Sequence, residues 1–231
     1  MNRVVITGAG VVSSLGMDLT TNLNSLSEGK NGISPIDFLN AERLSVRIGG
    51  QMHNYNPNDH FSKQENSIYD RFTQFALIAT KQAISSSGIE IREKDSSKFG
   101  VILGTAGGGL QTQDENYRQV YEEGKNRVHP LIVPKLMNNA AASNVSIKFN
   151  AQGPCFTIAS ACSSSNHAMG LALNLIRSGV IKVAITGGSE SMLCFGGIKA
   201  WEGLRIMSKD ACRPFCQTRD GMVQGEGAAI F

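Results

Sequence analysis

The stretch Thr157–Gly170 reads TIASACSSSNHAMG and decides how this chain folds. Its first part belongs to an apolar, β-branched run, which predicts a buried strand over Cys155–Ser160. Its second part opens a helical pattern over Ser163–Ser178, in which apolar residues recur on one face. The strand therefore turns abruptly into a helix, and Cys162 stands at the turn.

Cys162 has two possible interpretations at this turn. The N–H groups and the dipole of a helix N-terminus favour a thiolate, and the small residues Ala159, Ser160 and Ala161 leave room for a substrate carbonyl. The backbone N–H of Cys162 would point at that carbonyl oxygen and serve as half of an oxyanion hole. Alternatively, Cys162 is a small core residue in a strand-to-helix turn. The residues alone leave both interpretations open.

The rest of the chain alternates predicted strands with predicted helices. The strands are short and apolar, and they lie at Val4–Thr7, Phe99–Leu103 and Val180–Thr186. The helices are more amphipathic, and they lie at Asp18–Glu28, Ser67–Ser87 and Pro134–Phe149. This alternation predicts an α/β fold in which a mostly parallel, mixed sheet is covered by helices on both faces.

Two segments lack such a pattern, at about residues 32–66 and 107–135, and we interpret them as loop-rich caps outside the main layers. The last five residues, Gly227–Phe231, have the pattern of a core strand that is just beginning. Domains usually end in polar, dispensable residues. We therefore expect either that the sequence is incomplete or that another chain supplies the rest.

Composition argues against several classes of function. The chain has 231 residues, of which 41% are hydrophobic and 18% are charged, and its net charge is +3. Few charges and 25 glycines suit a chain that buries much surface against a partner, so we expect an oligomer. The positive charges form no basic stripe, so nucleic-acid binding is not favoured, although a mildly basic surface could dock an acidic protein. No apolar run approaches the roughly 20 residues that span a bilayer, and the N-terminus lacks signal-peptide features.

The five cysteines are Cys155, Cys162, Cys194, Cys212 and Cys216. Their odd number and irregular spacing are not those of a disulfide framework, so we expect reduced thiols in a cytoplasmic protein. Cys212 and Cys216 form a C-x-x-x-C pair, but no second pair of cysteines or histidines at ligand spacing accompanies it. A zinc site is therefore not favoured.

Two glycine-rich turns point weakly to other enzymes. The loop Gly8–Ser13 lacks the sixth-position glycine or alanine and the later acidic residue of a dinucleotide site. The turn Gly187–Ser191 lacks the final glycine of a serine-hydrolase nucleophile elbow. Glu190 follows a buried strand, where a hydrogen-bonded structural carboxylate is favoured over a general base.

The stretch around Cys162 resembles the nucleophile motif of the β-ketoacyl synthases, most closely the elongating type II synthases of fatty acid and polyketide pathways. Further blocks resemble the same family in the same order. They are residues 3–10 (RVVITGAG), 187–190 (GGSE), 213–215 (RPF), 219–221 (RDG) and 225–228 (GEGA). The resemblance covers essentially the whole chain.

The resemblance implies a thiolase-like fold of α-β-α-β-α layers, built from two similar halves. Residues 1–231 match the N-terminal half, and the C-terminal half is absent. In the family, two histidines and a lysine of that second half bind the thioester carbonyl and assist decarboxylation of a malonyl unit. We interpret the four histidines of this chain as surface or structural residues instead; they are His53, His60, His129 and His167.

The implied activity is that of a β-ketoacyl-acyl-carrier-protein synthase. Cys162 takes an acyl group as a thioester, and the carbanion left by decarboxylation of malonyl carrier attacks it. No metal or organic cofactor is implied, because the malonyl carboxylate supplies the driving force and the thiolate supplies covalent catalysis. The implied partners are an acyl carrier protein with acyl and malonyl cargo and a second subunit, either an identical copy or a chain-length factor.

Four more residues receive roles from the resemblance. Gly107 falls where elongating synthases often carry a bulky aliphatic residue of the acyl pocket, and Trp201 falls where an aromatic lies beside that pocket. Lys63 and Arg205 match carrier-docking positions, while two neighbouring docking positions, 67 and 68, are not basic here. The missing side chain at Gly107 either makes the pocket roomier or only meets a turn requirement of its glycine-rich loop, and the thinned docking cluster suggests an atypical carrier.

Other identities stay open. A non-catalytic chain-length factor is one, although such partners lack the active cysteine and Cys162 is present. The 231-residue polypeptide could itself be an inactive fragment that needs its other half. A thiolase or an initiating synthase is a further possibility, against which the RPF block and the GGSE turn argue.

Overall fold

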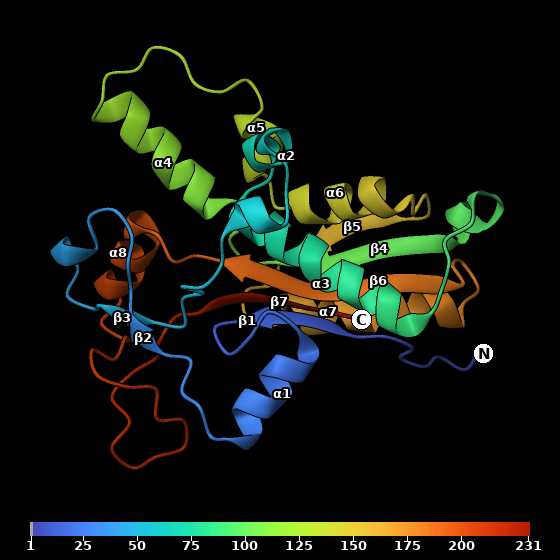
Figure 1. Ribbon diagram of the computed structural model, residues 1–231, viewed down its shortest axis with the longest axis horizontal. Coiled ribbons are helices and arrows are strands. Elements are labelled where there is room, and N and C mark those ends of the chain that lie inside the picture. Colours follow the sequence, from blue (N-terminus) through green and yellow to red (C-terminus); the bar gives the residue numbers. More distant parts are fainter. Residues whose placement is uncertain (1) are drawn as a thin grey trace.

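A five-stranded sheet organises the computed structural model, which describes residues 2–231. In spatial order its strands are β1 (Gly10–Ser13), β7 (Glu226–Ile230), β6 (Val183–Ser191), β4 (Phe99–Gly104) and β5 (Cys155–Ile158). β4 runs parallel to both β5 and β6, while β7 runs antiparallel to β6 and to β1. Four of the five strands therefore share one direction (Figure 1), which confirms the predicted mostly parallel, mixed sheet.

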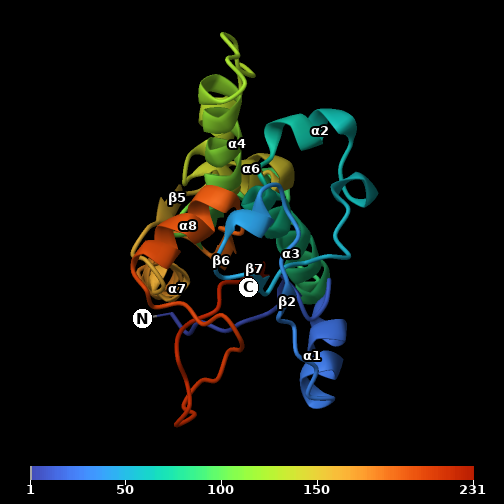
Figure 2. The same cartoon turned by 90° about the vertical axis from the view of Figure 1, so that its left-hand side faces the viewer.

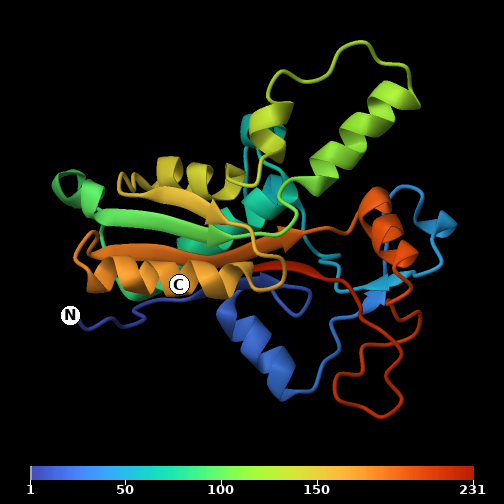
Figure 3. The same ribbon diagram turned by 180° about the vertical axis from the view of Figure 1, so that it is seen from behind.

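Helices cover both faces of the sheet. α3 (Arg71–Ser87) and α6 (Ala140–Phe149) pack on one face, and α7 (Ser164–Arg177) packs on β4, β5 and β6 from the other. Figure 3 shows α7 in front of the strands, with α6 above them. The result is a three-layer α-β-α unit, as expected for one half of the thiolase-like fold. No helix among the described residues is both long and apolar enough to cross a membrane.

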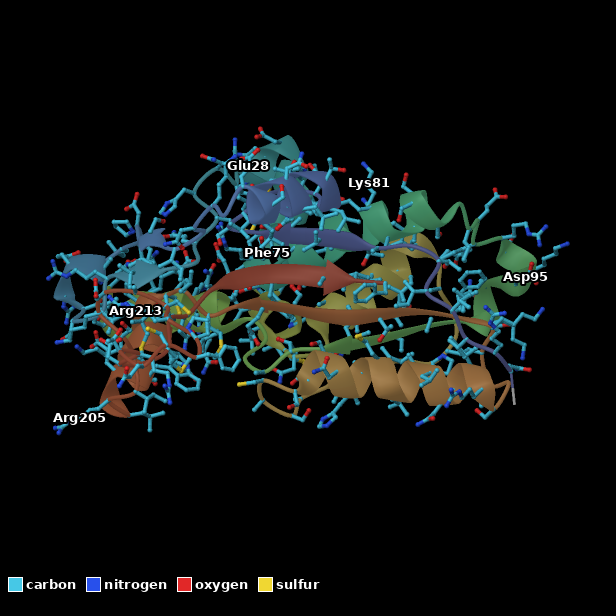
Figure 4. The ribbon with its side chains drawn as sticks, turned by 90° about the horizontal axis from the view of Figure 1, so that it is seen from below. Glu28, Phe75, Lys81, Asp95, Arg205 and Arg213 are labelled. Carbon is cyan, nitrogen blue, oxygen red and sulfur yellow. The ribbon has the colours of Figure 1, made fainter. Side chains whose placement is uncertain are left out.

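α3 is the central helix of the larger core. Its apolar positions recur every three to four residues, and Phe72 and Phe75 are completely buried. Gly88, with a φ of 65°, ends it in the left-handed conformation that glycine adopts without strain. Figure 4 shows Phe75 directed toward the sheet and Lys81 directed away from it.

The predicted helix over Ser67–Ser87 is two helices. α2 (Lys63–Ile68) ends before the break, and α3 begins at Arg71. Asp70 causes the break, because its carboxylate accepts the backbone N–H of Phe72 as the N-cap of α3. The same carboxylate accepts the N–H and the hydroxyl of Thr112, at 2.9 and 2.6 Å.

The predicted strand Val4–Thr7 was wrong. Residues 2–9 contain no strand, and β1 starts at Gly10. In the edge ladder Gly10 lies opposite Ile230, the last residue of β7. The structure describes no strand paired with residues 2–9. Val5 and Ile6 are consequently 59% and 67% exposed.

Two further segments differ from the prediction in where their helices begin and end. The segment 107–135 is not mainly loop, since α4 (Leu110–Tyr121) and α5 (Ile132–Leu136) occupy much of it. α4 and the loop after it project away from the sheet (Figure 2). The predicted helix Pro134–Phe149 is likewise interrupted, because α5 ends at Leu136 and α6 starts at Ala140.

The remaining elements are short. α1 (Leu19–Ser27) has Asp18 as its N-cap, as predicted, and α8 (Phe195–Gly203) follows β6. The cap over residues 32–66 holds a two-stranded ribbon of β2 (Ser34–Pro35) and β3 (Ile48–Gly49). Three 3-10 helices complete the list, at Ala41–Arg43, Pro57–Asp59 and Glu93–Lys98.

A largely buried ion pair between α3 and β7 also binds the backbone of Met52 in this cap. Arg71 donates to both carboxylate oxygens of Glu226 on β7, at 2.8 and 2.6 Å. Glu226 also accepts the backbone N–H of Met52 and the hydroxyl of Ser191, both at 2.9 Å. A buried charge is tolerated when its lone pairs are filled in this way. The arrangement holds the cap against the end of the sheet where the candidate site lies.

Candidate functional site

The carboxyl ends of β4, β5 and β6 meet at one edge of the sheet, and an open cavity of about 550 Å³ lies there. Ligands commonly bind outside the carboxyl ends of parallel strands. The wall includes Thr105 after β4, Cys162 after β5, Glu190 near the end of β6 and Trp201 from α8. The topology thus gathers four segments that are distant in the sequence around one cavity.

Cys162 lies in the turn between β5 and α7 and is exposed to solvent. Ser163 is the N-cap of α7, but its side chain makes no capping hydrogen bond. Within the described residues, the N–H groups of Cys162, Ser165 and Asn166 have no acceptor. Unpaired N–H groups at a helix N-terminus attract negative charge. The turn therefore offers donors both to a thiolate and to an oxyanion formed beside it.

Two glycines let α7 approach the sheet this closely. A Cβ on Gly104, at the end of β4, would lie 2.3 Å from the carbonyl carbon of Ser164. A Cβ on Gly188, in β6, would lie 2.6 Å from the Cβ of Ser165. Any larger residue at either position would lift the first turn of α7 off the strands. β6 also runs through Gly187 and Gly188 to Ser191, whereas the sequence predicted that it would end at Thr186.

The backbone just before Cys162 is unusual. Ala161 has a φ of 53°, in the left-handed region that residues with a Cβ rarely adopt. Around it, the N–H of Ser163 donates to the carbonyl of Ser160 at 3.3 Å, and the Ser160 hydroxyl bonds His167 Nδ1 at 2.6 Å. Strained residues persist where neighbours fix them, and they cluster at active sites. The strain here falls one residue before Cys162.

Glu190 is held by the loop that follows β4. Its carboxylate accepts the N–H groups of Ala106 and Gly107, at 2.7 and 3.2 Å, and the hydroxyl of Thr105 at 3.3 Å. Burial raises the pKa of Glu190, although these hydrogen bonds oppose the shift. The predicted hydrogen bonding of this carboxylate is confirmed, and Glu190 forms part of one wall of the cavity.

The two predicted acyl-pocket residues differ in position. Trp201 lines the cavity together with Cys162. Gly107 does not line it directly, and a Cβ there would lie 3.0 Å from Cε of Met192, which does. Sequence reasoning missed Met192, which is the first residue after the end of β6.

The two predicted docking residues lie outside the cavity. Lys63 is the first residue of α2, and Arg205 follows the C-cap of α8; both are exposed. Figure 4 shows the Arg205 side chain pointing away from the molecule. Neither residue forms an ion pair within residues 2–231. They are thus available to a partner but are not part of the chemical site.

The histidines have contacts that suit structural roles, as predicted. His53 bonds the hydroxyl of Ser34 at 2.9 Å, and His60 stacks on Tyr55 with ring centroids 5.8 Å apart. His129 accepts the N–H of Leu131 at 3.3 Å. His167 bonds Ser160, as described above. Within residues 2–231 no histidine or lysine lines the cavity.

The five cysteines are free thiols with different surroundings. Cys194 is 7% exposed, and burial raises the pKa of its thiol to about 12. Cys216 lies on an exposed loop, where hydrogen bonding with Thr218 lowers the pKa of its thiol. Cys155 and Cys212 are exposed but lie outside the cavity wall. Among the described cysteines, only Cys162 lines the cavity at the carboxyl edge.

Comparison with known proteins gives one consistent family. A family model described as "Beta-ketoacyl synthase, N-terminal domain" matches residues 1–231. The 3-oxoacyl-(acyl-carrier-protein) synthase 2 of Staphylococcus aureus (strain COL) is 36% identical over 234 residues, which cover 99% of this chain and 56% of that protein. The chain thus spans little more than half the length of this curated relative.

Solved structures agree with the sequence matches. A β-ketoacyl synthase from Burkholderia phymatum STM815 superposes with a TM-score of 0.87 and 26% identity, over 100% of this chain and 58% of that one. A type II PKS acyl carrier protein in complex with its ketosynthase bound to the hexaketide gives a TM-score of 0.81 and 26% identity, over 98% and 56%. Both cover the α-β-α unit and its cavity edge.

Proposed function

The chain belongs to the β-ketoacyl synthase family, and on that premise we propose that it carries the nucleophile of a β-ketoacyl-acyl-carrier-protein synthase. The observation that supports this most directly is the position of Cys162, an exposed thiol that lines the cavity one residue before the N-cap of α7. In this proposal residues 1–231 are the N-terminal half, with caps at about 32–66 and 107–135.

The first proposed step is transfer of the acyl chain to the protein. The Cys162 thiolate attacks the carbonyl carbon of an acyl thioester on the carrier, and a new C–S bond forms to Cys162. The bond to the carrier sulfur breaks, and the carrier leaves as a thiol with the proton that Cys162 gave up. The unpaired N–H of Cys162 is placed to stabilise the transient oxyanion.

The second proposed step forms the carbon–carbon bond. Malonyl carrier loses CO₂, and the electron pair of the broken bond stays on its α-carbon as a carbanion. That carbon attacks the Cys162 thioester, a C–C bond forms as the C–S bond breaks, and the departing Cys162 thiolate regains a proton from water. The proposed step uses no metal or organic cofactor. Because no histidine or lysine lines the cavity within residues 2–231, we expect this chain alone to show no malonyl decarboxylation.

The proposed partners follow from the same reaction. An acyl carrier protein would deliver acyl and malonyl cargo, and Lys63 and Arg205 are exposed cations that could meet an acidic carrier. The second subunit is proposed to be an identical copy or a chain-length factor. A cytoplasmic location is proposed because all five cysteines are free thiols.

Covalent labelling tests the proposal. The intact protein is treated with an acyl-shaped thiol reagent, such as a cerulenin-type epoxide, and the modified peptide is found by mass spectrometry. We expect Cys162 to react first, and Cys162→Ser to lose the label. Iodoacetamide is the comparison reagent, because a small electrophile should also reach Cys216, whose thiol pKa is lowered. Preferential acyl-reagent labelling of Cys194 or Cys216 contradicts the proposal.

A further inference from the structure

A single hydroxyl bridges the strained residue before the nucleophile. The Ser164 hydroxyl donates to the carbonyl oxygen of Ala161 at 2.6 Å and accepts the backbone N–H of Ser160 at 2.9 Å. The Ser164 N–H also donates to the Ala161 carbonyl, at 3.1 Å. Ser164 thus binds the backbone on both sides of the Ser160–Ala161 peptide.

The hydroxyl is buried and fully used. Ser164 is 4% exposed, because it lies against the backbone of Gly104 at the end of β4. Its oxygen serves once as donor and once as acceptor, so its removal would leave the Ser160 N–H without a partner and the Ala161 carbonyl with only the Ser164 N–H. Ser163, its neighbour, makes no side-chain hydrogen bond among the described residues.

The bridge matters because Ala161 has a φ of 53°. A residue with a Cβ leaves the left-handed region unless its surroundings hold it there. Release of the Ser160–Ala161 peptide would rotate Cys162, the next residue, away from the unpaired N–H groups of Ser165 and Asn166. The thiol and its own N–H would then no longer face the cavity together.

We propose that Ser164 is a positioning residue, whose hydroxyl locks Ala161 in the left-handed conformation and so aims Cys162 into the cavity. This inference rests on the proposed role of Cys162. It assigns Ser164 no contact with substrate. The prediction that separates it from a merely structural serine is that relief of the strain at Ala161 should replace the hydroxyl.

The test compares Cys162 labelling in four forms of the intact protein: the parent, Ser164→Ala, Ala161→Gly/Ser164→Ala and the matched control Ser163→Ala. We expect Ser164→Ala to slow labelling by the acyl-shaped epoxide by about tenfold or more, the rate change that corresponds to one buried hydrogen-bonding group left without its partner. Glycine adopts a positive φ without strain. The double variant should therefore recover most of the rate, and Ser163→Ala should stay within about twofold of the parent.

Two other cysteines report on the fold in the same sample. Cys194 is buried and should stay unlabelled by iodoacetamide in every variant that is folded. Cys216 is exposed and should react at the parental rate.

An unchanged rate of Cys162 labelling in Ser164→Ala overturns the inference. A loss of labelling rate that Ala161→Gly fails to recover, while Cys194 stays protected, also overturns it. The inference is also overturned if iodoacetamide labels Cys194 in Ser164→Ala and the double variant does not restore the rate of Cys162 labelling. A parent protein without acyl-reagent preference for Cys162 would instead overturn the proposed function.

Discussion

The two faces of the sheet are packed very differently. On α3, nine of 17 residues are buried, and they include large aromatic side chains such as Phe72 and Phe75. On α7, three of 14 are buried, and all three are small: Ser164, Ala168 and Ala172. The face with α3 therefore supplies most of the hydrophobic stabilisation. The face with α7 supplies a close approach of helix to strand, which brings the helix N-terminus and Cys162 to the cavity.

Matched leucine truncations give the largest expected contrast between the faces. Leu77 on α3 is 4% exposed, so Leu77→Ala should lower the free energy of unfolding by about 2–5 kcal/mol. Leu173 on α7 is only half-buried in this chain, and Leu173→Ala should cost about 1 kcal/mol or less. Urea unfolding of the 231-residue chain measures both. Equal losses would show that α7 carries as much of the core as α3.

Glu190→Gln tests the cavity wall, because it removes the contribution of the Glu190 carboxyl group to the pH dependence of stability. Because burial raises the pKa of Glu190 above its usual 4.5, the unfolded chain ionises this group first as pH rises. The parent therefore loses stability from Glu190 as pH rises past 4.5, until the raised folded pKa is passed. Glutamine lacks this dependence, and its amide group could repel the N–H groups of Ala106 and Gly107, which costs about 1–3 kcal/mol.

The measurement for Glu190 is the unfolding free energy of both proteins at several pH values. The stability advantage of the parent over Glu190→Gln should shrink as pH rises above 4.5. An advantage that grows with pH would mean that the three hydrogen bonds outweigh burial and that the folded-state pKa is lowered.

Of these substitutions, Gly107→Ile should have the smallest effect on stability, and it should change the selectivity for acyl-chain length. The new side chain would meet Cε of Met192, the flexible end of a side chain, and push Met192 into the cavity. We expect a shorter maximum acyl chain in transfer assays of the intact protein. Gly170→Ala on α7, where a Cβ would meet nothing within 4 Å, is the control and should leave chain length unchanged. An unaltered chain-length profile in Gly107→Ile would show that residue 107 does not limit the size of the acyl pocket.

Periodicity predicted the parts of the fold that depend on local sequence. The strand from Cys155, the helix ending near Ser178 and the cap at Asp18 are within two residues of their predicted limits. Non-local effects account for the errors. Val4–Thr7 has strand composition but no paired strand among the described residues, and Asp70 starts a new helix as the N-cap of α3 while it also binds Thr112 on α4.

The candidate site was predictable only where a motif marks it. Cys162 and Trp201 line the cavity, and Glu190 has the structural bonds expected of it. Ser164 and Met192 were missed, because their roles depend on contacts that sequence spacing does not reveal. The positive φ of Ala161 was also invisible, since alanine has no preference for that conformation.

The pairing of β1 with β7 has a consequence for synthesis of the protein. Val12 is completely buried, yet the ladder partner of β1 is β7, which lies far later in the sequence at Glu226–Ile230. A ribosome adds about 5–20 residues per second, so β1 waits about 10–40 seconds for that partner to emerge. During this interval its free backbone groups can pair with other nascent chains. Overexpression should therefore favour aggregates that form through this edge of β1.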